Sequence, residues 1–126
     1  MSQLDRSHDN NKWQAICFTE DDTMQQAIKL TSSELSVYRS PESMVEVLRP
    51  SYPVYCVRPA KIRKIAKTFL KGFPGDVLYA VKCNSEPHML QELYQAGIRH
   101  FDTASLPEIS LVSEMFSDGQ AYFMHQ

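Results

Sequence analysis

The chain has 126 residues, 43% of them hydrophobic and 22% charged, which is enough for one small domain with a hydrophobic core. Its net charge of -2 does not favour nucleic acid or an anionic membrane as a partner. No apolar run approaches the roughly 20 residues of a membrane-spanning helix, and the polar start MSQLDRSHDN lacks the apolar core of a signal peptide. The three cysteines are far apart, which fits the reducing cytoplasm better than a disulfide framework. No spacing typical of a metal site occurs.

The first 52 residues carry weaker signals than the rest and are expected to form an extension with short helices. Residues 15–18 favour a short strand, and residues 23–35 (TMQQAIKLTSSEL) favour a helix. The segment SPESMVEVLRP predicts a further helix, in which Ser40 is the cap, Pro41 is the first helical residue and Pro50 stops the helix.

From residue 53 onward, strands and helices alternate. Short β-rich runs predict strands at 53–57, 77–81, 100–104 and 120–124, and the first of these is closed by Pro59. Helical spacing of apolar residues predicts helices at 60–73, 85–98 and 105–116, of which Ser85 and Ser105 cap the second and third.

This alternation, with its short connections, predicts right-handed βαβ crossovers and a parallel sheet, so the fold class is α/β. A doubly wound sheet and a (β/α)8 barrel both begin in this way. A barrel typically takes about 250 residues, so the chain is expected to hold only part of one.

Lys82 stands at the end of the apolar run VLYAV, where a parallel α/β fold meets its ligands. A lysine at the inner rim of such a sheet is expected to be partly desolvated, which favours the neutral amine. A neutral amine is a nucleophile towards an aldehyde, as a Schiff-base lysine must be.

The residues alone also allow plainer interpretations. Lys82 could leave the strand and extend into water, and Asp102 could be a solvated loop residue. Glu108 could be only the capping-box partner of Ser105. His88 is expected to be a surface residue.

The motif YAVKCN, followed about twenty residues later by FDTASLPEI, resembles the ornithine/lysine/arginine decarboxylases of the eukaryotic ornithine-decarboxylase type. These are pyridoxal-phosphate enzymes of fold type III, and the resemblance covers about residues 52 to 125. It implies the N-terminal part of an alanine-racemase-like (β/α)8 barrel. It also implies that PVYCVRP is the β-domain strand that precedes the barrel. The expected domains are therefore an extension at 1–52 and an incomplete barrel at 53–126.

The resemblance implies roles for four residues. Lys82 matches the lysine that holds pyridoxal 5'-phosphate as an internal aldimine. Asp102 matches an acid close to that lysine, which would pair with its amine and help return it to the neutral base. Ala80 matches a small residue beside the cofactor ring, and Glu108 a second acid near the lysine. The family often has FDCAS, so Thr103 is a departure from the pattern.

The implied activity is decarboxylation of a basic amino acid by a cytoplasmic homodimer. Cys83 points to the ornithine branch, which makes putrescine for polyamine biosynthesis, because diaminopimelate decarboxylases usually carry YAxKAN. The sequence does not choose ornithine over lysine or arginine. The groups that the family uses for the cofactor phosphate, the ring nitrogen and the substrate's distal amine have no match here, so the chain alone is expected to be inactive. Three alternatives stay open: a non-catalytic relative or fragment that binds a partner, a diaminopimelate decarboxylase-like enzyme, and a cofactor carrier that shares the barrel.

Overall fold

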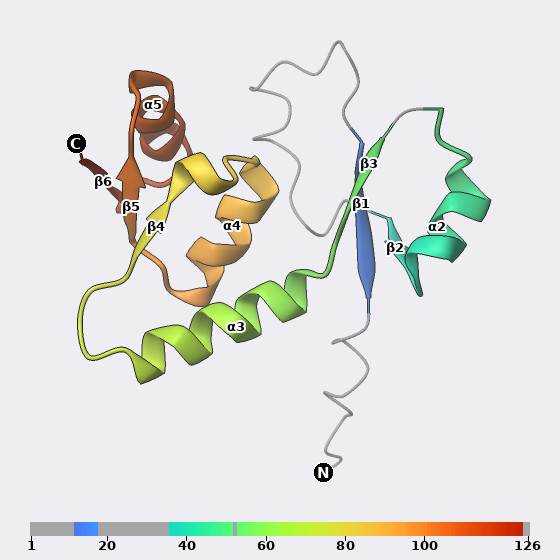
Figure 1. Cartoon of the computed structure of the whole chain (residues 1–126), viewed down its shortest axis with the longest axis horizontal. Helices are drawn as coiled ribbons and strands as arrows, with labels where there is room; N and C mark the ends of the chain where they lie inside the picture. The colour runs from blue at the N-terminus through green and yellow to red at the C-terminus, as the bar shows by residue number, and fades with distance from the viewer. Residues whose placement is uncertain (1–11, 18–35, 52, 125–126) are drawn as a thin grey trace. The chain divides into compact units, whose positions relative to one another are not determined.

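A computed structural model describes residues 12–17, 36–51 and 53–124, which belong to two compact units that divide between Lys61 and Ile62 (Figure 1). The boundary that the sequence predicts at 52/53 separates an extension from the start of a barrel and stays a prediction. The predicted helix at 23–35 lies outside the described residues, as does Phe18 at the end of the first predicted strand.

The first unit contains a small antiparallel sheet in the order β2-β1-β3, formed by Val37–Tyr38, Trp13–Cys17 and Val54–Val57. Helix α2, Pro41–Leu48, begins as predicted. Ser40 accepts a hydrogen bond from the Ser43 amide, and Pro41 is the first helical residue. Met44 lies buried on this helix, and its Sδ is 3.8 Å from Cys56 Sγ. The run VYCV pairs with β1 in the antiparallel sheet, so among the described strands it is not part of the parallel sheet.

The second unit is built on a parallel sheet in the order β4-β5-β6, formed by Leu78–Ala80, His100–Thr103 and Gln120–Phe123. Helices α3 (Pro59–Gly72), α4 (Pro87–Ala96) and α5 (Leu106–Met115) alternate with these strands along the chain. The core consists of apolar side chains from α4, β5, α5 and the segments next to them, among them Val81, Leu90, Phe101, Leu111, Val112 and Phe116. The predicted parallel α/β arrangement is thus present, with three strands in the described part of the chain.

Local signals set the helix ends. Ser105 caps α5 as predicted, because its hydroxyl accepts a hydrogen bond from the Glu108 amide at 3.4 Å. Gly97 ends α4 in the left-handed conformation (φ 116°), which glycine adopts without strain. The expected cap of α4 was wrong: Glu86, rather than Ser85, accepts from the Met89 amide at 3.0 Å.

Pro59 follows the end of β3 by two residues and is also the first residue of α3, where its missing N–H costs nothing. Two further expectations need correction. The strand expected at 77–81 ends at Ala80, since Val81–Cys83 form one 3-10 turn. His88 is buried, with 6% of its surface exposed, because it lies in the first turn of α4 among core residues.

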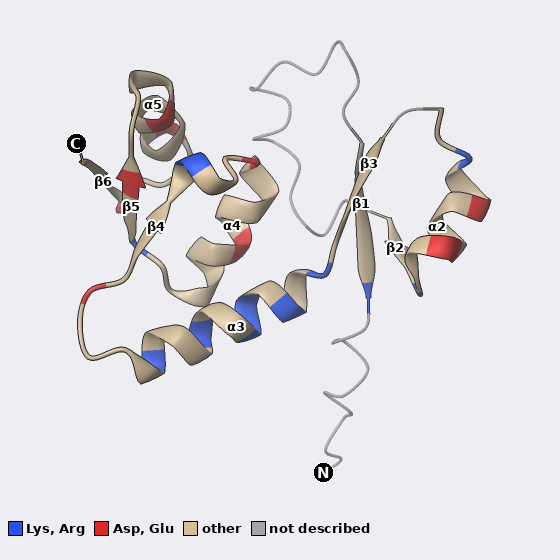
Figure 2. Ribbon diagram, viewed as in Figure 1, with Lys and Arg blue, Asp and Glu red and all other residues tan. Residues whose placement is uncertain are grey.

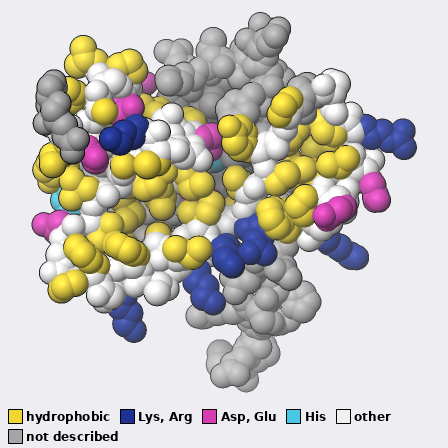
Figure 3. All heavy atoms as spheres, viewed as in Figure 1, with side chains coloured by type: hydrophobic (Ala, Val, Ile, Leu, Met, Phe, Trp, Pro, Cys, Tyr) yellow, Lys and Arg dark blue, Asp and Glu magenta, His cyan; other side chains and the backbone are white. Residues whose placement is uncertain are grey.

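Helix α3 has one basic and one apolar side. Its lysines and arginines follow one edge of the ribbon (Figure 2). Hydrophobic side chains reach the surface along the same helix (Figure 3), and Ile65 and Phe69 are each more than half exposed. Arg63 also pairs with Glu92 of α4, whose side chain is only 3% exposed, so an ion pair ties α3 to α4.

Candidate functional site

The end of β4 presents Lys82 at the carboxyl edge of the parallel sheet. The strand stops at Ala80, and the next residue, Val81, is completely buried. Lys82 and Cys83 follow in the same 3-10 turn, and both are exposed. The buried valine therefore anchors the turn, while the amine extends away from the core. This is the edge at which parallel α/β folds bind ligands.

Strand register brings Asp102 next to this turn. In the β4–β5 pair, Ala80 lies opposite Asp102 and Tyr79 lies opposite Phe101. Partners in register share a face of the sheet, and Phe101 and Thr103 are both fully buried on the other face. The methyl group of Ala80 and the carboxylate of Asp102 thus lie side by side on the face opposite the buried one. Asp102 is half-buried, and its carboxylate has no hydrogen bond or ion pair within the described ranges.

The sequence predicted that Lys82 is partly desolvated, and this prediction was wrong. Its side chain is exposed, and it makes no ion pair with Asp102 in the described part of the chain. The physical reason lies in the sheet: β4 is at its edge, so in the described residues no strand lies beyond it to cover the lysine. Water therefore reaches the amine.

In the described residues, Glu108 makes its hydrogen bonds at the start of its own helix, α5. Its Oε2 accepts a hydrogen bond of 2.7 Å from the Ala104 amide, and its own amide donates to Ser105. This is a capping arrangement at the start of α5, shifted by one residue from the expected return bond to Ser105. The structure thus shows the capping contact, whereas a role near the cofactor stays a prediction.

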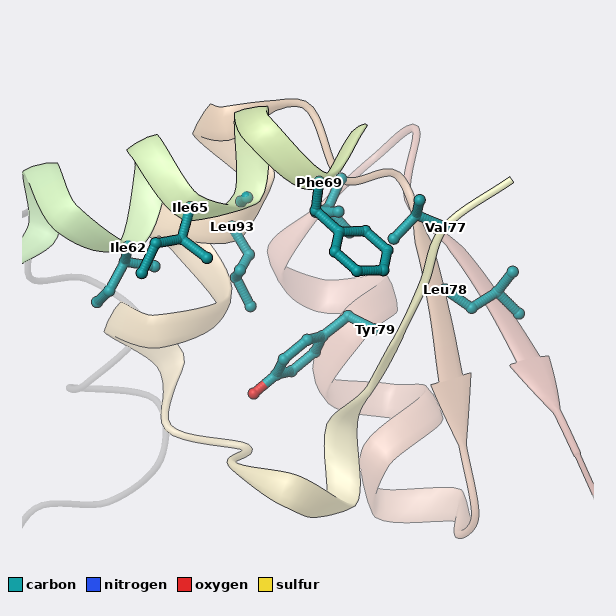
Figure 4. Close-up of a pocket in the computed structure, with 9 residues that line it drawn as sticks. Ile62, Ile65, Phe69, Val77, Leu78, Tyr79 and Leu93 are labelled. Carbon is teal, nitrogen blue, oxygen red and sulfur yellow. The ribbon is translucent and has the colours of Figure 1, made fainter. Parts of the chain in front are cut away.

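A chain of hydrogen bonds holds the lysine-bearing turn and was not expected from the sequence. The Tyr79 hydroxyl donates to the Asn84 carbonyl at 3.1 Å, and Asn84 Oδ1 accepts from the Glu86 amide at 3.0 Å. The Glu86 carboxylate in turn caps α4. Tyr79 projects from β4 toward the helices, and Leu78 projects to the opposite side (Figure 4). The side-chain bond of Asn84 to the Glu86 amide, two residues on, makes Asn84 a turn residue.

A second polar group was also not expected from the sequence. It lies on the face of the sheet opposite the buried Phe101 and Thr103, which we call the open face. The Tyr122 hydroxyl donates to Gln120 Oε1 at 2.6 Å and lies 3.1 Å from His100 Nδ1. Tyr122 is the register partner of Asp102. The polar residues alternate at His100 and Asp102, and again at Gln120 and Tyr122, so a period of two along each strand was the available signal.

The residues that the structure describes support neither a metal site nor a membrane-spanning helix. They contain no group of three or more His, Cys, Asp or Glu side chains placed to hold a metal ion. None of their helices is both long and apolar enough to cross a bilayer.

The fold and the site thus define an α/β protein in which a lysine stands at the carboxyl edge of a parallel sheet, where such proteins bind their ligands, and an unpaired carboxylate, Asp102, lies beside Ala80. Residues 59–124 match the family model described as pyridoxal-dependent decarboxylase, pyridoxal binding domain. The chain belongs to this family, and pyridoxal phosphate is the cofactor of its domain. Comparisons with curated proteins and with solved structures returned no significant match.

The described residues fit the amine-binding end of this cofactor. Lys82 offers a primary amine, the methyl group of Ala80 leaves space on the open face, and the free carboxylate of Asp102 lies beside it. In the described residues the phosphate end has no comparable counterpart, since the four glycines stand apart at positions 72, 75, 97 and 119. A glycine-rich phosphate loop is not formed by such spacing.

Proposed function

We propose that the chain is the lysine-bearing part of a pyridoxal-phosphate decarboxylase for a basic amino acid, and that its sheet is the beginning of a (β/α)8 barrel. The observation that carries the proposal is the register of β4 with β5, which sets Asp102 beside Ala80, two residues before Lys82. In a family whose domain binds pyridoxal phosphate, an amine, a small side chain and an acid at the ligand-binding edge of the sheet support this proposal.

When bound, pyridoxal phosphate supplies an aldehyde that condenses with a primary amine with loss of water, and a ring that accepts the electron pair left by departing carbon dioxide. Lys82 would hold the cofactor through Nζ and regain its proton when substrate takes its place. Asp102 would pair with the ammonium form and accept a proton from it, which returns Lys82 to the neutral base. Ala80 would leave room for the ring. Glu108 would support the turn before α5 as a second acid near this edge.

The proposed substrate is ornithine, with lysine, arginine and diaminopimelate as competitors. Support comes from the motif YAVKCN, since Cys83 is the feature that separates the ornithine branch from the diaminopimelate branch. Cys83 is exposed and follows Lys82 directly, so it lies at the same edge. We further propose a cytoplasmic homodimer, which the resemblance implies.

Reductive trapping tests the proposal. Borohydride reduction of the cofactor-loaded protein, purified from the cells that make it, should fix the cofactor on Lys82, as peptide mapping by mass spectrometry would show. Carbon dioxide release from the four candidate amino acids would then identify the substrate. A label on Lys67 or Lys71 would contradict the assignment. A correctly labelled protein that releases no carbon dioxide from any of the four would favour a non-catalytic relative.

Asp102→Asn is expected to slow steps in which Lys82 exchanges protons, by about 10²-fold in kcat, the lower range for general acid–base catalysis. The amide keeps the size of the side chain but does not accept a proton. Stability should change by no more than about 0.5 kcal/mol, because the carboxylate of Asp102 has no hydrogen bond or ion pair in the described residues. Single-turnover kinetics measures the effect, and Asp118→Asn, in the segment between α5 and β6, is the control. Unchanged kinetics in Asp102→Asn would make this residue a bystander.

A further inference from the structure

We propose that Tyr79 is a positioning residue for Lys82, acting through the peptide carbonyl of Asn84. The inference rests on the proposed role of Lys82 and adds to it a residue that holds the lysine-bearing turn from the helix side of the sheet. The contacts that carry it are the bond from the Tyr79 hydroxyl to the Asn84 carbonyl, 3.1 Å, and the bond from the Glu86 amide to Asn84 Oδ1, 3.0 Å.

The turn needs such a support, because a three-residue 3-10 segment has few backbone bonds of its own. It begins at Val81, which is fully buried and fixes the entry of the chain. Its exit at Asn84 is extended (φ -162°, ψ 104°), so no helical bond continues from there. The Tyr79 hydroxyl thus spans Val81–Cys83 and ties the exit of the turn to the strand from which it began. The lysine backbone is held at both ends.

Tyr79 is itself well placed to act as a fixed donor. Its ring lines an apolar pocket of about 340 Å³, together with Ile62 and Phe69 of α3 and Leu93 of α4. Figure 4 shows the ring on the helix side of β4. Burial raises the pKa of Tyr79, and the charge of a Cys83 thiolate would raise it further. The hydroxyl therefore keeps its proton, and its bond to Asn84, throughout the neutral range.

The support continues into α4. Asn84 Oδ1 accepts from the Glu86 amide, and Glu86 Oε2 accepts from the Met89 amide at 3.0 Å. The other carboxylate oxygen, Oε1, is buried with no hydrogen-bond partner in the described chain. One connected set of bonds therefore runs from β4, around the lysine, to the first turn of α4. A shift of the Lys82 backbone would disturb these bonds, and a misplaced reacting group slows catalysis steeply.

Tyr79→Phe tests the inference, because it removes only the hydroxyl and keeps the ring in the pocket. In the 126-residue chain, the amides of residues 82–86 should exchange with deuterium roughly 2- to 10-fold faster, the factor that one net hydrogen bond supplies. In the cofactor-loaded protein, the apparent affinity for pyridoxal phosphate should fall, and the pH profile of the bound cofactor's absorbance should shift. Tyr94→Phe is the matched control: its hydroxyl bonds to Asp118, at the other end of α4, so both readouts should stay unchanged.

Asn84 provides the rescue experiment. Asn84→Asp keeps an acceptor for the Glu86 amide and should retain slow exchange at residues 82–86, whereas Asn84→Ala should not. Unchanged exchange in Tyr79→Phe, or faster exchange with unchanged cofactor affinity and pH profile, would overturn the positioning role. These outcomes differ from a failure of the proposed function, which would appear in the wild-type protein as trapping on another lysine.

Discussion

Lys82→Ala is expected to leave the protein without covalently held cofactor and without decarboxylase activity. No other lysine of the second unit stands at the carboxyl edge of the parallel sheet, since the rest lie on α3. Alanine has no amine to take up the aldehyde, so reduction with borohydride should add no cofactor mass to the peptide containing residue 82. The measurement is the mass of the reduced protein, together with the absorbance of the bound cofactor.

The fold should survive this change. Lys82 is exposed and has no ion pair in the described residues, and substitutions at such positions usually alter stability by less than about 0.5 kcal/mol. Circular dichroism and the urea midpoint of the variant should therefore match the wild type. Lys71→Ala, in the last turn of α3, is the control and should retain the cofactor. Persistent attachment in Lys82→Ala would remove the basis of the proposed function.

Arg63→Met is expected to be the most destabilising single change proposed here, lowering the free energy of unfolding by about 3–5 kcal/mol. It leaves the Glu92 carboxylate, whose side chain is 3% exposed, without its cation. A charge buried without a partner is costly, and a small unit has only about 5–15 kcal/mol of stability in total. Urea unfolding followed by circular dichroism gives the value.

A second variant keeps this prediction testable if Arg63→Met does not fold. The double change Arg63→Met with Glu92→Met removes both charges and should recover most of the lost stability, because replacing a buried pair by apolar side chains is often close to neutral. Lys64→Met, the next residue on α3 and exposed, should change little. A loss below about 1 kcal/mol in Arg63→Met would show that the pair behaves like an exposed one.

The open face of the sheet illustrates why part of the candidate site was predictable. Lys82 and Asp102 could be chosen from the sequence because each ends or occupies a short apolar strand within a recognisable motif. A parallel arrangement brings the carboxyl ends of the strands to one edge, and the register of Ala80 with Asp102 agrees with the placement of both residues at that edge. The exposure of Lys82 could not be predicted from the sequence, because its solvation depends on which strands flank β4 and not on the residues of β4 itself.

Sequence by itself determined the features that depend on neighbouring residues. Ser40 and Ser105 cap their helices, Gly97 ends α4, and α3, α4 and α5 follow strands as their periodicity predicted. Backbone dihedral preferences and side-chain spacing act within a few residues, so helix caps and helical periodicity can be predicted from the local sequence. The motif around Lys82 is equally local, and it led to the family that residues 59–124 match.

Only the tertiary structure decided the contacts between distant or non-periodic positions. The pairing of VYCV with β1, the ion pair of Arg63 with Glu92 and the burial of His88 all depend on how elements pack together. The bond from Tyr79 to Asn84 joins residues only five apart, yet it requires the strand to stop at Ala80 and the chain to turn back. That turn forms because Val81 is drawn into the core, and burial of a side chain is a property of the whole unit rather than of the sequence around it.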